Sequence, residues 1–213
     1  ALPPANTLPR YLEAAAIAKA GRGTESLGEA MVVVSRANNT RDPLLYPKPL
    51  WFSGYPQTGM QYAQLSREIY ADVSAPLYAL TQQVVLAAQR PDSIAQGQDE
   101  RTWLLQIEAM GRRLVVDSDP KGSLQAIAGI SIQMQAVQAL SELLQREGEG
   151  DSAEAQAFAQ RLDVLRGALN VLNEFEASRD DRIERNREEY WLPLMLILYT
   201  LGILTTVYLC ARV

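Results

Sequence analysis

The sequence predicts an all-α protein: an elongated helical bundle with one irregular proline- and aromatic-rich loop and a C-terminal transmembrane helix. Three observations support this class. Ala, Leu and Gln are abundant and runs of β-branched residues are rare, a composition that favours helix. Apolar residues recur at steps of three and four along much of the chain. The stretch from Trp191 to Ala211 contains no charged residue.

The uncharged stretch at 191–211 is long enough to cross a bilayer, because about twenty helical residues span roughly 30 Å of hydrocarbon. Trp191 lies at one end and Tyr208 near the other, where aromatic rings favour the headgroup region. Arg212 follows, and its long side chain can reach the interface. Pro193 falls in the first turn, where a missing N–H costs no hydrogen bond. We therefore predict a membrane anchor with the lipid bilayer as a partner.

Residues 1–9 carry three prolines and predict an extended arm, in which Thr7 is a candidate N-cap for the first helix. A helical bundle domain is predicted over 10–178. Its first two helices are expected on either side of Gly21 and Gly23, which interrupt the helical pattern because glycine disfavours a helix interior.

Residues 38–59 are the least regular part of this domain. Four prolines and two glycines exclude a helix of useful length there. The segment also carries the aromatic residues Tyr46, Trp51, Phe52 and Tyr55. Loops are normally polar, so these rings need a surface to cover. Two interpretations stay open: a lid over the domain's own core, or a docking surface for a partner chain that proline orders in advance.

Apolar stripes predict further helices at about 60–90, 99–116, 123–146 and 152–178. Pro76 should bend or split the first of them, because proline removes an internal hydrogen bond. The last two have coiled-coil-like spacing and a short connection, and so predict an antiparallel hairpin.

Glutamine fills much of the helix predicted at 123–146. Its amides can pair between subunits without burying charge, so Gln133 and Gln138 are candidate partner-binding residues. The highly charged residues 179–190 predict a solvated helical stalk between the bundle and the anchor. The alternative is an electrostatic contact with a neighbouring subunit.

Composition argues against most catalytic and metal chemistry. There is no histidine, and the one cysteine, Cys210, lies in the predicted anchor, so a Ser-His-Asp triad and a Cys/His metal cage are both excluded. Asp117 and Asp119 are spaced as in a calcium loop, but Ala128 stands where the bidentate Glu is required. A net charge of −5 argues against nucleic-acid binding. We expect no enzyme, no cofactor and no metal site.

The segment Leu114–Leu144 resembles the helical hairpin of the minor pilus-tip and stalk proteins of type IV secretion and conjugal transfer systems. The matching residues are a short motif and the glutamines after it: Gly122, Ser123, Leu124, Gln125, Ala126, Gln133, Gln135 and Gln138. The resemblance implies an exported, helical, non-enzymatic protein that assembles with pilus subunits and inner-membrane channel components. The predicted membrane helix departs from the family pattern, and it favours a place in the stalk or channel base over one at the tip.

These observations together predict a membrane-anchored structural subunit of a bacterial envelope-spanning complex, whose partners are other protein subunits; whether it also forms a homo-oligomer stays open. The start at Ala1 fits removal of an export signal, and removal of an initiator Met would leave the same start. We favour export, which predicts a single-pass inner-membrane protein with its bulk in the periplasm. One alternative is a periplasmic ligand-sensing domain with Trp103 and Arg112 lining a pocket. The other is a cytoplasmic tail-anchored adaptor, which the arginines before the anchor favour.

Overall fold

The computed structural model describes residues 6–21, 24–44, 59–89, 100–118 and 123–186. Within these ranges the chain forms six α-helices and no β-strand, and the predicted all-α class is confirmed. The helices are α1 (Leu8–Ala20), α2 (Thr24–Asn38), α3 (Gly59–Ala88), α4 (Glu100–Val116), α5 (Ser123–Arg146) and α6 (Ala153–Asn186).

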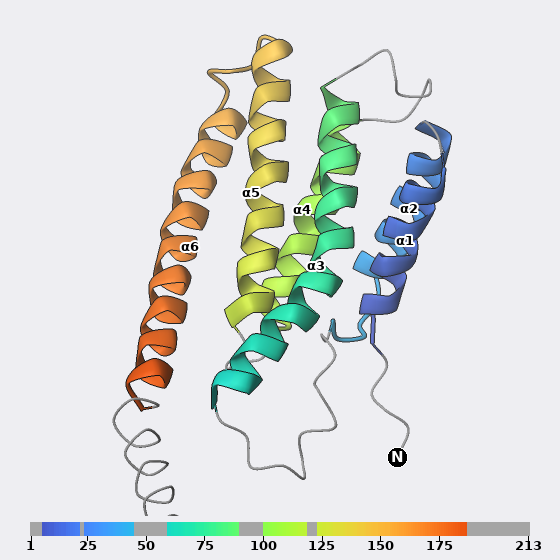
Figure 1. Cartoon of the computed structure of the whole chain (residues 1–213). Coiled ribbons are helices and arrows are strands. Elements are labelled where there is room, and N and C mark those ends of the chain that lie inside the picture. The colour runs from blue at the N-terminus through green and yellow to red at the C-terminus, as the bar shows by residue number, and fades with distance from the viewer. Residues whose placement is uncertain (1–5, 22–23, 45–58, 90–99, 119–122, 187–213) are drawn as a thin grey trace, which may run out of the picture.

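The helices lie side by side in an elongated array (Figure 1). α6 forms one edge and packs almost entirely on α5. α5 also packs on α3 and α4, and the α1–α2 pair covers the far side of those two helices. The α5–α6 hairpin has the predicted form. Gly148, the second residue after α5, has a φ of 80°, a left-handed conformation that glycine adopts without strain.

Two apolar clusters hold the array together. The main cluster takes buried side chains from α1 to α5, and Tyr11, Leu80, Leu104 and Leu140 are among its most buried members. The second is small and lies between α5 and α6, around Ile130, Val137 and Leu165. The valine-rich run in α2 belongs to the main cluster, as its helical spacing predicts, since Met31 and Val34 are buried there.

α4 and α5 cross at a pair of glycines. A Cβ atom placed on Gly111 would lie 2.7 Å from the carbonyl oxygen of Gly129. One placed on Gly129 would lie 2.6 Å from the carbonyl oxygen of Gly111. Both distances are shorter than a carbon–oxygen contact permits, so the two backbones approach this closely only because neither residue has a side chain.

Arg113 of α4 ties the segment that follows α2 to the bundle. Its guanidinium donates to the carbonyl oxygens of Ala37, in the last turn of α2, and of Asp42. The Thr7 hydroxyl donates to the same Asp42 carbonyl at 2.8 Å. A cation at the carboxyl end of a helix satisfies free carbonyls and complements the helix dipole.

Leu44 is fixed through both of its backbone polar groups. Its N–H donates to the Asp117 carboxylate at 2.9 Å, and the Gln125 amide donates to its carbonyl oxygen at 3.1 Å. The same amide donates to the carbonyl oxygen of Leu114 at 3.0 Å. The Gln125 side chain therefore joins α4 to the segment after α2 by hydrogen bonds, and it holds Leu44, the residue directly before the aromatic segment 45–58.

Two boundaries differ from the prediction. α1 begins at Leu8, inside the predicted arm, and both Thr7 and Leu8 are buried. Thr7 occupies the N-cap position but its side chain makes no capping bond; its hydroxyl donates to the carbonyl oxygen of Asp42. α6 continues without a break to Asn186, so the predicted stalk begins as part of the same helix. α3 remains one helix through Pro76, and Figure 1 shows it bent along its length, so of the two predicted outcomes the helix is bent and not split.

The predicted anchor and the aromatic loop are not part of the described structure. Residues 187–213, with Trp191, Pro193, Tyr208 and Arg212, lie outside the described ranges, as do residues 45–58. None of the helices in the described ranges combines the length and the apolar character needed to cross a bilayer.

Candidate interaction site

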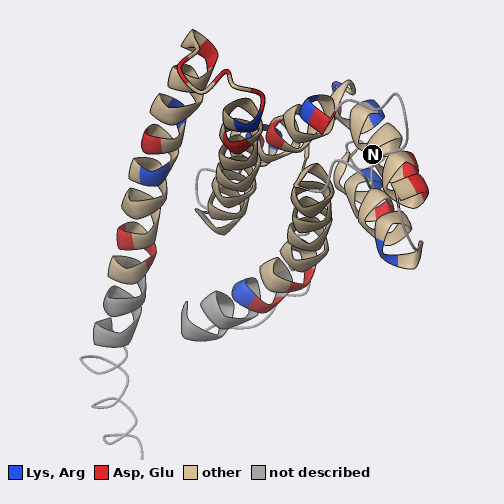
Figure 2. Cartoon of the chain, turned by 90° about the horizontal axis from the view of Figure 1, so that it is seen from above, with Lys and Arg blue, Asp and Glu red and all other residues tan. Residues whose placement is uncertain are grey.

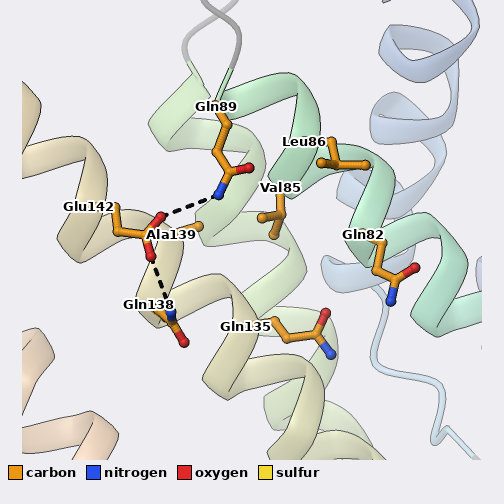
Figure 3. A pocket seen from close by; sticks show the side chains of 8 residues that line it. All are labelled: Gln82, Val85, Leu86, Gln89, Gln135, Gln138, Ala139 and Glu142. Atoms are coloured by element: carbon orange, nitrogen blue, oxygen red, sulfur yellow. Dashed lines mark hydrogen bonds between the residues drawn. The ribbon is translucent and has the colours of Figure 1, made fainter.

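A groove runs between α3 and α5 on the outside of the bundle (Figure 3). Its cavity volume is about 350 Å³. Eight residues line it: Gln82, Val85, Leu86, Gln89, Gln135, Gln138, Ala139 and Glu142. Half of them are glutamines, so the groove offers amide donors and acceptors on either side of a small apolar strip.

The sequence builds this groove from one repeated pattern. On each helix the lining residues follow the spacing i, i+3, i+4, i+7, which places them on a single face. The neighbouring face of α3 is buried through Leu77, Leu80 and Val84, and that of α5 through Ala136 and Leu140. The main core therefore fixes both walls, and the groove side chains stand at its outer edge.

The groove contains a single charged side chain, Glu142. Gln89 donates to one of its carboxylate oxygens at 3.3 Å, and Gln138 donates to the other at 3.1 Å. Glu142 forms no ion pair with any residue of the described ranges. Two neutral amides thus orient a carboxylate whose charge they do not balance.

The nearest arginine along α5 points elsewhere. Arg146, one turn after Glu142, donates to the carbonyl oxygen of Ala88 at 2.8 Å and lies 4.0 Å from the Glu100 carboxylate. It joins the end of α3 to the start of α4, where a cation finds a free carbonyl and an acidic first turn. Arg146, Gln145, Gln89 and Glu142 line a second cavity of about 400 Å³, which extends the groove toward the end of α5.

The groove lies in the least charged part of the array. α5 carries only Glu142 and Arg146 as charged residues, and α3 carries none after Asp72. Figure 2 shows charges spread along α6 and over α1 and α2 instead. Next to the groove, Tyr78 of α3 is half-buried, and burial raises the pKa of its hydroxyl, although a hydrogen bond with the Ser131 side chain lowers it in part.

Of the two predicted glutamines, only Gln138 lies in the groove. Gln133 is 4% exposed; its amide donates to the Gly129 carbonyl oxygen at 3.4 Å and accepts from Arg161 at 3.3 Å. Its assignment to a partner-binding surface is wrong, because the side chain is enclosed where α4, α5 and α6 meet. The predicted aromatic residues Tyr46, Trp51, Phe52 and Tyr55 lie outside the described ranges.

Sequence reasoning missed a buried charged cluster between α4 and α6. The Glu108 carboxylate is almost fully buried, and it accepts from Arg112 at 2.7 Å and from Arg161 of α6. This cluster holds α6 against α4 and α5. Trp103, which was expected to share a ligand pocket with Arg112, belongs to the main core, whereas Arg112 is more than half exposed.

Among the described residues, no group of three or more acidic, histidine or cysteine side chains is arranged to hold a metal ion. Comparisons with protein-family models, with curated proteins and with solved structures each gave no significant match to this chain.

Proposed function

We propose that this chain is a membrane-anchored structural subunit of a bacterial envelope-spanning complex, and that it binds another subunit through the α3–α5 groove. The observation that supports this proposal is the groove itself. It combines exposed glutamine amides with the apolar surface of Leu86, which is 52% exposed. A surface of this mixed kind suits a partner chain better than a buried small molecule, because its polar groups remain accessible on both walls.

Two sequence features extend the proposal to a membrane complex. The uncharged segment 191–211 supplies an anchor four residues after the end of the continuous helix α6, which at 34 residues is about 50 Å long. The GSLQA motif and the glutamines after it give the resemblance to type IV secretion and conjugation proteins. On this proposal α6 carries the bundle away from the inner membrane on its periplasmic side, and the groove faces a neighbouring subunit.

The test is extraction and copurification of the full chain. We expect it to stay with the membrane fraction through a high-salt wash, and to be recovered in mild detergent with a stoichiometric partner. Leu86→Ser should release the partner, because it replaces the large apolar side chain that the groove exposes with a polar one. Leu105→Ser is the matched control: Leu105 is 42% exposed on α4 and does not line the groove.

Three results would contradict the proposal. The chain could be recovered in the aqueous fraction without detergent, it could be recovered alone, or Leu86→Ser could retain as much partner as Leu105→Ser. A compartment-specific reporter fused at Ala1 tests the orientation separately. Activity of a cytoplasmic reporter would favour the tail-anchored adaptor over the periplasmic subunit.

A further inference from the structure

We infer that Glu142 receives a lysine or arginine side chain from the partner subunit, and that this cation is held between Gln89 and Gln138 at the end of the groove. The inference rests on the proposed function, because it names the chemistry of the partner for that same groove. It depends on the charge of Glu142, on the direction of Arg146 and on the apolar strip beside them.

The charge of Glu142 is uncompensated although its position is fixed. Its two carboxylate oxygens accept from Gln89 and Gln138, and an amide donor orients a carboxylate without neutralising it. The obvious internal cation, Arg146, stands one turn away on the same helix, where it could form an i, i+4 pair. It is bound instead to the Ala88 carbonyl and lies beside Glu100, so the Glu142 carboxylate stays open to the groove.

The groove also fits the stem of a long cationic side chain. Val85, Leu86 and Ala139 form an apolar strip that leads to Glu142 (Figure 3). Methylene groups of Lys or Arg pack on such a strip while the charged head reaches a polar partner. Gln82 and Gln135, at the other end of the groove, form no hydrogen bond with any residue of the described ranges, and their amides can meet the backbone or polar side chains of the same partner segment.

The sign of the charge decides the class of occupant. An acidic segment or a phosphate would meet repulsion from Glu142, and one carboxylate with two amides is too few ligands for a stable divalent-cation site. The occupant that satisfies the groove is an amphipathic helix of another subunit with one basic residue among small apolar ones. Two parallel helices such as α3 and α5 offer a third helix a continuous channel.

The probe is a pair of blocked, alanine-rich helical peptides of about four turns that differ at one central position. One carries arginine there, and the other carries citrulline, which keeps the planar shape but has no charge and has an acceptor oxygen in place of one donor nitrogen. Each is titrated into the full chain in detergent micelles, and the side-chain amide signals of Gln89 and Gln138 are followed by NMR. Glu142→Gln removes the carboxylate, and Glu147→Gln makes the same charge change at an exposed position outside the groove.

We expect the arginine peptide to shift both amide signals and to bind at least about tenfold more tightly than the citrulline peptide. Glu142→Gln should abolish that difference, and Glu147→Gln should preserve it. Equal binding of the two peptides, absence of shifts at Gln89 and Gln138, or full binding to Glu142→Gln would each overturn the inference.

Copurification distinguishes a failure of the cation assignment at Glu142 from a failure of the proposed function. If the partner is recovered as fully with Glu142→Gln as with Glu147→Gln but is lost with Leu86→Ser, the groove is a binding site and the cation assignment is wrong. If no partner is recovered with the unaltered chain, the proposed function itself fails.

Discussion

The crossing of α4 and α5 at Gly111 and Gly129 gives a sharp test of the packing. In most helices Gly→Ala stabilises the protein by about 1 kcal/mol, because alanine is the better helix former. At this crossing the new methyl group of Gly111→Ala would lie 2.7 Å from the Gly129 carbonyl oxygen and 2.8 Å from the Cγ atom of Gln133. The carbonyl belongs to a rigid helix, so the helices must separate by roughly half an ångström to restore an ordinary contact.

Overpacking of this kind costs about 3 kcal/mol where backbone rather than a flexible side chain must move. After the gain in helix propensity is subtracted, we expect a net loss of about 2 kcal/mol for Gly111→Ala or Gly129→Ala. For a domain of this size that lowers Tm by about 4–8 °C. Urea and thermal unfolding followed by far-UV circular dichroism measure both quantities.

Gly167 of α6 is the matched control, because a Cβ atom there meets nothing within 4 Å. Gly167→Ala should raise stability by about 0.5–1 kcal/mol. The double variant of Gly111 and Gly129 should lose less than the sum of its single variants, since the first methyl group already separates the helices. Stabilisation by Gly111→Ala comparable to that of Gly167→Ala would refute the close crossing.

Three further predictions concern buried polar groups. Burial raises the pKa of Tyr11 to about 12 from 10.0, so the unfolded chain loses this proton first. The Tyr11 hydroxyl should therefore leave the free energy of unfolding unchanged below pH 10 and lower it by up to about 3 kcal/mol between pH 10 and 12. Urea titrations at each pH measure this decline, and Tyr11→Phe should remove the contribution of Tyr11 to it. Arg113→Met leaves two carbonyl oxygens without a charged donor and should cost about 2–4 kcal/mol in urea unfolding. Arg166→Met, whose ion pair with Asp163 is exposed at both partners, should cost less than about 1 kcal/mol, and similar losses for the two variants would contradict the role of Arg113. Arg161→Met should lower the free energy of unfolding by about 2–3 kcal/mol, because it leaves the buried Glu108 carboxylate with one cation. An unchanged midpoint in urea unfolding would show that this cluster does not hold α6 on the bundle.

Helical periodicity predicted the positions of the helices well because each has one face in a continuous core. The predicted segments 123–146 and 99–116 match α5 and α4 to within one residue at each end. For Pro76 the local rule left two outcomes open, a bend or a split, and α3 is bent but unbroken, since it packs on both α1 and α5.

Periodicity could not predict which individual glutamine side chains of α5 are buried and which are exposed. α5 contacts α3, α4 and α6, so almost every face of it meets another helix. Gln125 and Gln133 are buried and bonded to backbone carbonyls, whereas Gln138 and Gln145 are exposed. Composition alone treats these amides as equivalent, because what separates them is the rotation of α5 against three neighbours.

The glycine crossing and the Arg113 contacts were also missed, for a related reason. Both depend on distances between segments far apart in the chain, and neither leaves a periodic signal. A glycine inside each of two otherwise strong helices was the available hint, because a helix retains glycine at a cost unless a neighbour comes close.

The small size of the α5–α6 cluster has a consequence for how copies of the chain meet. α6 joins the rest mainly through the cluster of Ile130, Val137 and Leu165 and through ion pairs such as that of Arg161. The fully buried members of the main core all come from outside α6, and only the partly buried Phe158 of α6 packs on them. If the turn at 147–152 straightens, α6 of one molecule can occupy the same place on α5 of another and remake every contact reciprocally. Such a swapped dimer needs no new interface, and its population is set by chain concentration and by the cost of straightening the turn.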